Sequence, residues 1–223
     1  MIILLIGLVG FIGWNLYPHQ NLQNLPDELI SLNSELGLKL LEQADFKQDY
    51  ALIDNHFIAQ STVSYCGVAS GAMVLNALGE KTDQINFFNA NTNNIKSRWQ
   101  VTFTGMSLSD LTGFLLAYGK PVKTYYASDS SLDLFRQVLR DNLQNEHDFI
   151  LVNYQREALG QGRVGHISPI VAFHQQNDLV LIMDTAAHKY PPTWVPVSLL
   201  FNAMLEQDNS VGKSRGYIEV SAN

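Results

Sequence analysis

The sequence predicts an α+β fold, in which a helical N-terminal half packs on an antiparallel sheet from the C-terminal half. Two observations predict it. Apolar residues recur at helical spacing in several segments up to residue 143. Beyond that point, short β-branched and aromatic runs alternate with turn-forming residues. Helices early in a chain and strands late in it are typical of this fold class.

The helix signals are the more specific ones in the first half of the chain. Gly79 stands where it would cap a helix, and Ser107 with Asp110 resembles a capping box. Helices are predicted over residues 27–44, 66–79, 107–118 and 131–143. Residues 50–60 are predicted to be irregular or extended, and residues 80–105, rich in Asn, Thr and Gln, to form a long surface excursion. Strands are predicted over residues 149–154, 166–173, 179–184 and 216–220.

Size and charge restrict the class of protein. The 223 residues, 46% hydrophobic and 16% charged, are typical of one globular domain. A net charge of −7 without a Lys or Arg cluster argues against a nucleic-acid partner, because such binding requires cations to neutralise phosphates.

The amino terminus differs from the rest of the chain. Residues 2–16 are almost wholly apolar, and the first Lys or Arg is Lys39. We predict that residues 1–17 are a signal peptide or membrane anchor, that residues 18–30 are a linker, and that residues 31–223 form the folded domain. The protein would then be exported, periplasmic or membrane-anchored in a bacterium, touching the membrane only through this segment. It would be cytoplasmic if the segment is not a signal.

The chain contains one cysteine, Cys66, which excludes an intramolecular disulfide and a Cys-rich zinc site. A lone cysteine is more often a small buried apolar residue than a nucleophile. Cys66, however, stands where a loop enters a predicted helix, so its sulfur would face free N–H groups and the positive end of the helix dipole. With a histidine nearby, such a setting lowers a thiol pKa from about 8.5 to roughly 3.5–7.5. Gly67 would let backbone N–H groups approach a reacting carbonyl.

Position selects His166 as the general base among the six histidines. His166 begins one predicted strand and Asp184 ends the next, with a polar turn centred on residues 176–177 between them. In an antiparallel hairpin this places the two side chains nearly opposite each other. Asp184 would then orient the imidazole and stabilise its charged form. His188, in the loop beyond the sheet, is the alternative base.

Residues 160–165 match the pattern G-x-G-x-x-G. A dinucleotide site needs a helix after this pattern, whereas a strand follows directly here. We interpret the glycines as a flexible loop beside His166. The metal-ligand spacings HxxE and DxD are absent, so the sequence predicts neither a metal site nor a tightly bound cofactor.

Three motifs resemble the catalytic domain of phytochelatin synthase: SYCGVASGAMVLNALG (64–79), GHISPIVAF (165–173) and LIMDTAAHKYPPTWV (181–195). With GMSLSDLTGFLLAYG, LVNYQREALGQGR and KSRGYIEV they cover approximately residues 31–220 in collinear order, as in the short prokaryotic members of that family. The resemblance implies a papain-like cysteine peptidase fold with a Cys-His-Asp order, and makes residues 31–223 a catalytic domain.

The resemblance also implies roles for further residues. Gln60 corresponds to the glutamine of the oxyanion hole. The residues that would handle the γ-glutamyl end of the substrate are Asn153, Arg156, Gly165, Asp208 and Arg215. An Asp and one or two Arg suit the ammonium and carboxylate of a γ-glutamyl group.

By the same resemblance the substrate is glutathione. Cys66 would attack its Cys–Gly bond, release glycine, and pass the γ-glutamylcysteinyl group to water, to a second glutathione or to a phytochelatin. Cd or Zn ions would enter as glutathione thiolates. The Cys-rich C-terminal domain of eukaryotic members is not in this sequence, which favours water as the acceptor. The alternatives are a general papain-like peptidase and a non-catalytic thiol or metal-binding module. The sequence does not decide between a monomer and a homodimer.

Overall fold

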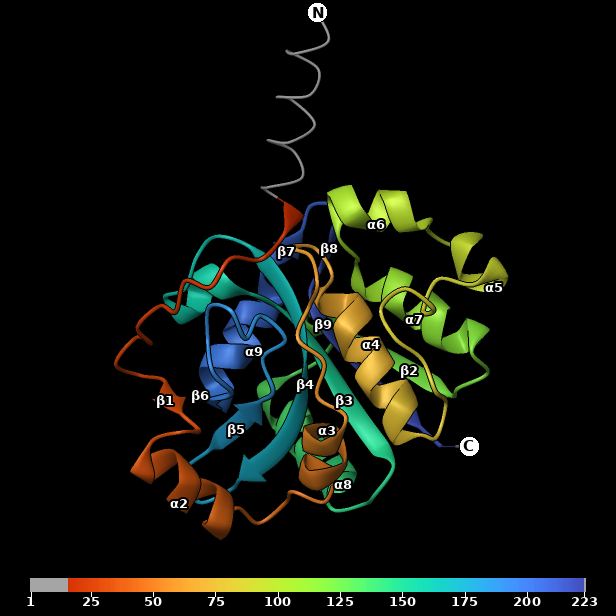
Figure 1. Cartoon of the computed structure of the whole chain (residues 1–223). Coiled ribbons are helices and arrows are strands. Elements are labelled where there is room, and N and C mark those ends of the chain that lie inside the picture. The colour runs from red at the N-terminus through yellow and green to blue at the C-terminus, as the bar shows by residue number, and fades with distance from the viewer. Residues whose placement is uncertain (1–15, 223) are drawn as a thin grey trace, which may run out of the picture.

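A seven-stranded antiparallel sheet organises the chain in a computed structural model that describes residues 16–222 (Figure 1). The strands follow the order β1-β6-β5-β4-β3-β9-β2. Their bounds are β1 Ile30–Ser31, β2 Val122–Tyr126, β3 Asp148–Gln155, β4 Gly165–His174, β5 Leu179–Ile182, β6 Thr193–Pro196 and β9 Gly216–Ser221. A separate short ladder pairs β7 Gln207–Asp208 with β8 Lys213–Ser214.

Helices lie on both faces of this sheet. The α-helices are α2 Glu35–Gln43, α3 Tyr50–Asn55, α4 Cys66–Ala77, α5 Ala90–Asn93, α6 Arg98–Thr104, α7 Leu108–Ala117, α8 Leu132–Leu143 and α9 Val197–Leu205. Two short 3₁₀ helices, η1 Ala127–Asp129 and η2 Arg156–Leu159, follow β2 and β3. The predicted α+β class is therefore confirmed, with most of the sheet drawn from the second half of the chain.

Strand alternation divides the buried side chains between two apolar clusters. Leu151 and Ile167 belong to the cluster that also contains α4 and α7 residues, whereas Ile150 and Val152 belong to the cluster with α8 and α9. Because successive strand residues point to opposite faces, β3 and β4 are buried on both sides. The site residues that these strands carry therefore have rigid support.

Three of the predicted helices are confirmed, and the structure shows the residues that cap them. Gly79, just beyond α4, has φ +85, and Gly119, just beyond α7, has φ +74. Ser107 and Asp110 form a capping box at the start of α7, and the Ser131 side chain caps α8. Each of these bonds joins residues close in sequence, so the sequence alone contains the signal.

Three other predictions were wrong in part. The helix predicted over residues 27–44 begins only at Glu35, because Ser34 caps it and Ile30–Ser31 pairs with β6. Residues 50–60 contain the helix α3, whose Ile53 is buried. The excursion over residues 80–105 contains α5 and α6, each begun by a capping box at Asn89 or Ser97. The strands β2 and β6 and the helix α9 were not predicted.

Residues 18–30, predicted as a linker, lie along the domain instead of leading away from it. The Asn21 amide donates to the His188 carbonyl and the Gln23 amide to the Lys189 carbonyl, both at 2.9 Å. The predicted signal or anchor falls almost entirely outside the described residues. Within residues 16–222, no helix combines the length and apolar character that a bilayer crossing requires.

Asp49 is fully buried, and burial together with the neighbouring acids Asp148 and Glu146 raises its pKa to about 8. The carboxyl accepts the His147 amide at 3.2 Å through Oδ1, while Oδ2 has no hydrogen-bond partner. The folded protein therefore binds a proton there between about pH 4 and pH 8 that the unfolded chain has released, so this group lowers stability as pH rises through that window.

Asp49→Asn keeps the acceptor and removes the titration. We expect the variant to match the parent within about 0.5 kcal/mol at pH 5 and to exceed its free energy of unfolding by about 4 kcal/mol at pH 9. Urea unfolding at both pH values measures this. A difference between the two proteins that does not change with pH would contradict it.

Candidate active site

Cys66 is the first residue of α4, the loop-to-helix position that the sequence predicted, and its buried side chain lines a cavity. Ser70, one turn later, fixes this helix end to β4. Its hydroxyl donates to the carbonyls of Cys66 at 2.8 Å and of Ile167 at 3.0 Å. Because Ile167 follows His166, this bridge sets the position of the thiol relative to the imidazole.

His166 and Asp184 come together as the hairpin prediction required, with Nε2 3.0 Å from Oδ1. A β-bulge at Val171 is needed for this. Ala172 pairs with Leu181, but Ile170 pairs with Ile182, so β4 contributes one extra residue. The shifted register places Asp184 opposite Ser168 and hence on the same face as His166. Without the bulge, Asp184 would lie opposite Pro169 and point to the other face.

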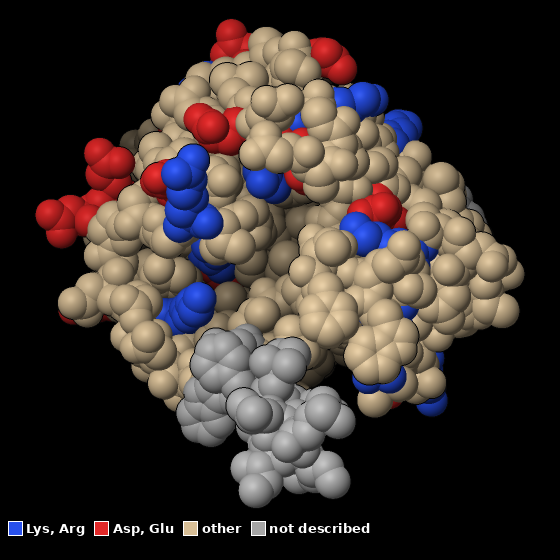
Figure 2. Space-filling model, turned by 90° about the horizontal axis from the view of Figure 1, so that it is seen from above, with Lys and Arg blue, Asp and Glu red and all other residues tan. Residues whose placement is uncertain are grey.

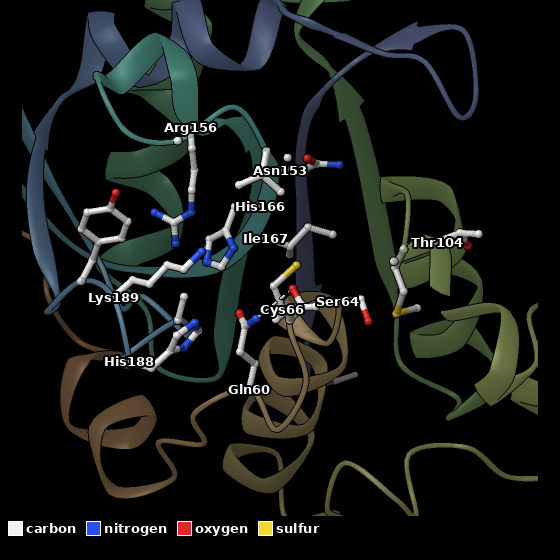
Figure 3. A pocket seen from close by; sticks show the side chains of 18 of the residues that line it. Gln60, Ser64, Cys66, Thr104, Asn153, Arg156, His166, Ile167, His188 and Lys189 are labelled. Atoms are coloured by element: carbon white, nitrogen blue, oxygen red, sulfur yellow. Dashed lines mark hydrogen bonds between the residues drawn. The ribbon is translucent and has the colours of Figure 1, made fainter. Parts of the chain in front are cut away.

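Two hydroxyls complete the environment of this ring nitrogen. The Ser168 hydroxyl lies 2.9 Å from Nε2 and the Thr185 hydroxyl 3.4 Å from it. Since Nε2 is occupied by this group of oxygens, Nδ1 is the nitrogen left to exchange a proton with Cys66. Figure 3 shows the His166 imidazole next to the sulfur of Cys66.

Arg156 binds the same carboxylate. Its Nη2 lies 2.7 Å from Oδ1 and 2.6 Å from Oδ2 of Asp184, and both side chains are buried. The guanidinium also lies over the Tyr190 ring, 4.9 Å from its centroid, and Nη1 bonds to Gln161. Arg156 thus binds Asp184 while it also lines the cavity, where the resemblance assigned it to the substrate.

These contacts set the charge state of the site. Burial raises the pKa of the Cys66 thiol, but the hydrogen bond and charge of His166 and the amides of Ile167 and Gly67 outweigh it and lower the pKa below its ordinary value. Burial and Arg156 lower the pKa of His166, yet Asp184 and Cys66 raise it further, so the net shift is upward. Burial raises the pKa of Asp184, but Arg156 and His166 hold it well below its usual range. The arrangement favours a thiolate–imidazolium pair at neutral pH.

Gln60 lies beside the thiol in the same cavity and is buried. Its amide nitrogen donates to the carbonyls of Thr62 at 2.9 Å and Val63 at 3.1 Å, while its oxygen accepts from Thr185 at 3.3 Å. Figure 3 shows the amide directed toward Cys66.

Four of the five residues assigned to the γ-glutamyl end form one cluster. Arg215 Nη1 donates to Asn153 Oδ1 at 2.8 Å and lies 3.7 Å from Asp208 Oδ2. Gly165 lies against the guanidinium, where a Cβ would collide with it. Arg156, the fifth, lines the same cavity and forms its ion pair with Asp184.

The cavity has a volume of about 710 Å³, within the range of small-molecule sites. Figure 2 shows it as a hollow bordered by basic side chains. Sequence reasoning missed several of its features. Ser70 and Thr185 carry no local signal, since they contact Ile167 and His166 from distant parts of the sequence, whereas Ser168 lies two positions from His166 on the same strand. Lys189 lines the wall, as do Asn21 and Gln23 from the segment predicted as a linker.

His188, the alternative base, also lines the cavity. The Asp184 carboxylate, however, binds His166, which favours His166 as the base. Burial and the adjacent Lys189 lower the pKa of His188, which keeps it neutral at physiological pH. The glycines of residues 160–165 end η2 and begin β4, so a strand follows them, as the sequence predicted. In the described part of the chain, no group of three or more His, Cys, Asp or Glu side chains could hold a metal ion.

Comparison with known proteins identifies the family. The model of the phytochelatin synthase family matches residues 20–217. The chain belongs to the phytochelatin synthase family. Members similar to it include glutathione γ-glutamylcysteinyltransferase 1 of Lotus japonicus, 34% identical over 86% of this chain and 39% of that protein. The enzyme of the same name from Arabidopsis thaliana is 34% identical over 75% of this chain and 36% of its own length.

A fungal phytochelatin synthase family member is also similar. The glutathione γ-glutamylcysteinyltransferase of Schizosaccharomyces pombe is 26% identical over 94% of this chain and 52% of its own length. The chain thus spans about two-fifths to one half of these curated relatives. The family match begins at residue 20, inside the segment predicted as a linker, which agrees with the packing of residues 21–23 on the domain.

Proposed function

We propose that this protein cleaves the Cys–Gly peptide bond of glutathione on a papain-like fold, through a γ-glutamylcysteinyl thioester at Cys66. Water is the favoured acceptor of the acyl group, and glutathione or a phytochelatin is the alternative. One observation carries the proposal: a thiol with a lowered pKa, hydrogen-bonded to a carboxylate-bound imidazole, lies in a cavity that also holds the Asn153–Asp208–Arg215 cluster.

The cluster supports the choice of substrate. A γ-glutamyl group ends in an ammonium and a free carboxylate, whereas an ordinary peptide chain has neither at that position. Arg215 is suited to the carboxylate and Asp208 to the ammonium, and both are mostly buried, which strengthens charged hydrogen bonds.

The chemistry follows from the site. The Cys66 thiolate attacks the carbonyl carbon of the Cys–Gly bond, and the Gln60 amide would donate to the developing oxyanion in place of one of its bonds to Thr62 or Val63. His166 protonates the glycine nitrogen as the C–N bond breaks. His166 then takes a proton from water, whose oxygen attacks the thioester carbon and releases the thiolate. A cadmium or zinc ion would participate as part of a glutathione thiolate substrate.

Product analysis with glutathione tests the proposal. We expect release of glycine and γ-glutamylcysteine in equal amounts, and loss of both in Cys66→Ala. In H₂¹⁸O, acyl transfer to water would place ¹⁸O in γ-glutamylcysteine, whereas transfer to glutathione would give phytochelatin. Repeating the reaction with Cd²⁺ shows whether the cadmium–glutathione thiolate shifts the acceptor of the acyl group from water to glutathione.

The matched control substrate is α-glutamylcysteinylglycine, which differs from glutathione only in the glutamyl linkage. Equal rates of cleavage of the two peptides would indicate a general peptidase and contradict the proposed specificity for glutathione. If neither glycine release nor an acyl adduct on Cys66 is detected, the proposal that the protein is a glutathione-cleaving enzyme is wrong.

Gly165→Ala tests the proposed substrate pocket. The added Cβ displaces the Arg215 guanidinium from Asn153 and Asp208. We expect KM for glutathione to rise about tenfold or more with a smaller change in kcat, because one charge-assisted bond is worth roughly 1.5–3 kcal/mol. Gly162→Ala, in the same loop with open space around it, is the control. An unchanged KM would show that Arg215 does not bind the substrate.

A further inference from the structure

An exposed aromatic pair on α6 is used by none of the chemistry above. Trp99 is 73% exposed and Phe103 is 61% exposed, and their rings stack with centroids 6.3 Å apart. Two large aromatic side chains at positions i and i+4 of a surface helix form an apolar face without a partner among the described residues. Arg98, beside Trp99, is also exposed.

This face continues to the mouth of the cavity and to the point where the apolar amino-terminal residues join the domain. The Ser64 hydroxyl donates to the Thr102 carbonyl of α6 at 2.7 Å. The neighbouring Val63, 45% exposed, donates its amide to the Leu16 carbonyl at 3.0 Å. Val63 and Phe103 both line the cavity. We name Tyr17, Val63, Trp99 and Phe103 the aromatic rim.

The amino-acid sequence before the aromatic rim indicates which kind of partner binds to the rim. Residues 2–16 carry no charged side chain and are almost wholly apolar, and they join the domain at Leu16, beside Val63. Aromatic side chains with a basic neighbour are the residues that anchor proteins in the interfacial layer of a bilayer. Figure 1 shows α6 at the same end of the molecule as residue 16, and Figure 2 shows basic side chains on this face.

We propose that the aromatic rim docks on a lipid bilayer, with Trp99 and Phe103 in the interfacial layer and the mouth of the Cys66 cavity facing the membrane surface. The rim contributes binding energy together with the amino-terminal residues, and it sets the orientation of the protein on the bilayer. The substrate then enters the cavity along the membrane–water interface. This inference does not depend on the proposed reaction, since it rests on exposed residues outside the Cys66–His166–Asp184 group.

Tryptophan fluorescence tests the orientation directly in the full chain. The three tryptophans are Trp14, Trp99 and Trp194, and Trp194 is fully buried. In Trp14→Phe, Trp99 is therefore the reporter that lipids can reach. With the protein reconstituted in phosphatidylcholine–phosphatidylglycerol vesicles, we expect a blue shift and at least twofold quenching by lipids brominated near the headgroup. Adding Trp99→Phe should abolish the quenching.

A matched pair of double variants tests the energetics. Trp99→Ser/Phe103→Ser should reduce co-sedimentation with these vesicles about tenfold or more, because two partly inserted aromatic side chains are lost. The control Leu36→Ser/Leu38→Ser removes two side chains of similar exposure, 53% and 56%, from α2 at the other end of the molecule, and should bind as the parent does.

Three results would overturn the proposal. The first is vesicle binding by the aromatic double variant within twofold of the parent, since the amino-terminal residues would then act alone. The second is Trp99 fluorescence that iodide does not quench before vesicles are added and that brominated lipid does not quench afterwards. Another part of the protein would then cover the rim. The third is a change in oligomeric state in the aromatic variant without a change in vesicle binding, which would make the rim a contact between copies.

Discussion

Asp184→Asn should lower kcat/KM for glycine release from glutathione by about 10³- to 10⁴-fold. The carboxylate binds the Nε2 side of His166 and the Arg156 guanidinium, and it also accepts the Ala186 amide at 2.8 Å. An asparagine can still hold the ring, but it cannot stabilise the imidazolium or neutralise a buried guanidinium. The imidazolium would lose its proton at lower pH, and the Cys66 thiolate would lose its counter-charge.

The pH dependence of thiol alkylation provides a second measurement. Because Cys66 is the one cysteine of the chain, the rate of reaction with iodoacetamide reports on it alone. We expect the ascending limb of this rate to move to higher pH in Asp184→Asn, toward the ordinary thiol pKa. An unchanged limb would mean that Asp184 has no part in activating the thiol.

Asp178→Asn is the matched control. Asp178 binds Arg136 through both oxygens, at 2.9 and 2.7 Å, but this ion pair lies in a surface turn. Its loss should cost less than about 1 kcal/mol and leave glycine release unchanged.

Arg156→Leu should destabilise the fold by about 3–5 kcal/mol, because among residues 16–222 it leaves the buried Asp184 with His166 as its one remaining ion-pair partner. It should also change catalysis in a specific direction. The Arg156 charge lowers the pKa of His166, so without it the imidazole should keep its proton to higher pH. The descending limb of the pH–rate profile should therefore move upward.

These measurements separate the two roles that sequence and structure assign to Arg156. A residue that binds the γ-glutamyl end would raise KM on removal, with little change in stability or in the pH profile. A residue that positions Asp184 would lower the urea midpoint and shift the pH profile. We expect the second result. Arg136→Leu, at the surface pair with Asp178, controls for the loss of a paired arginine and should lower the free energy of unfolding by less than about 1 kcal/mol.

The sequence by itself determined the local features of this protein. Caps at Ser107 and Ser131 and the glycine after α4 specify where helices begin and end, because each signal involves residues within one turn of each other. The same locality placed Cys66 at a helix start and His166 and Asp184 in one hairpin. Family motifs then supplied Gln60 and the Asn153–Asp208–Arg215 cluster, which the structure brings into the same cavity.

The tertiary structure decided the features that depend on partners distant in the chain. A single extra residue at Val171 sets the face on which Asp184 lies, and no local pattern marks it. Arg156 pairs with Asp184 across 28 positions, and hydrogen bonds to the loop at residues 188–189 hold residues 21–23 beside the cavity. The reason is physical: turns and caps are stabilised by neighbouring residues, whereas buried charges and strand register are fixed only when the whole chain has packed.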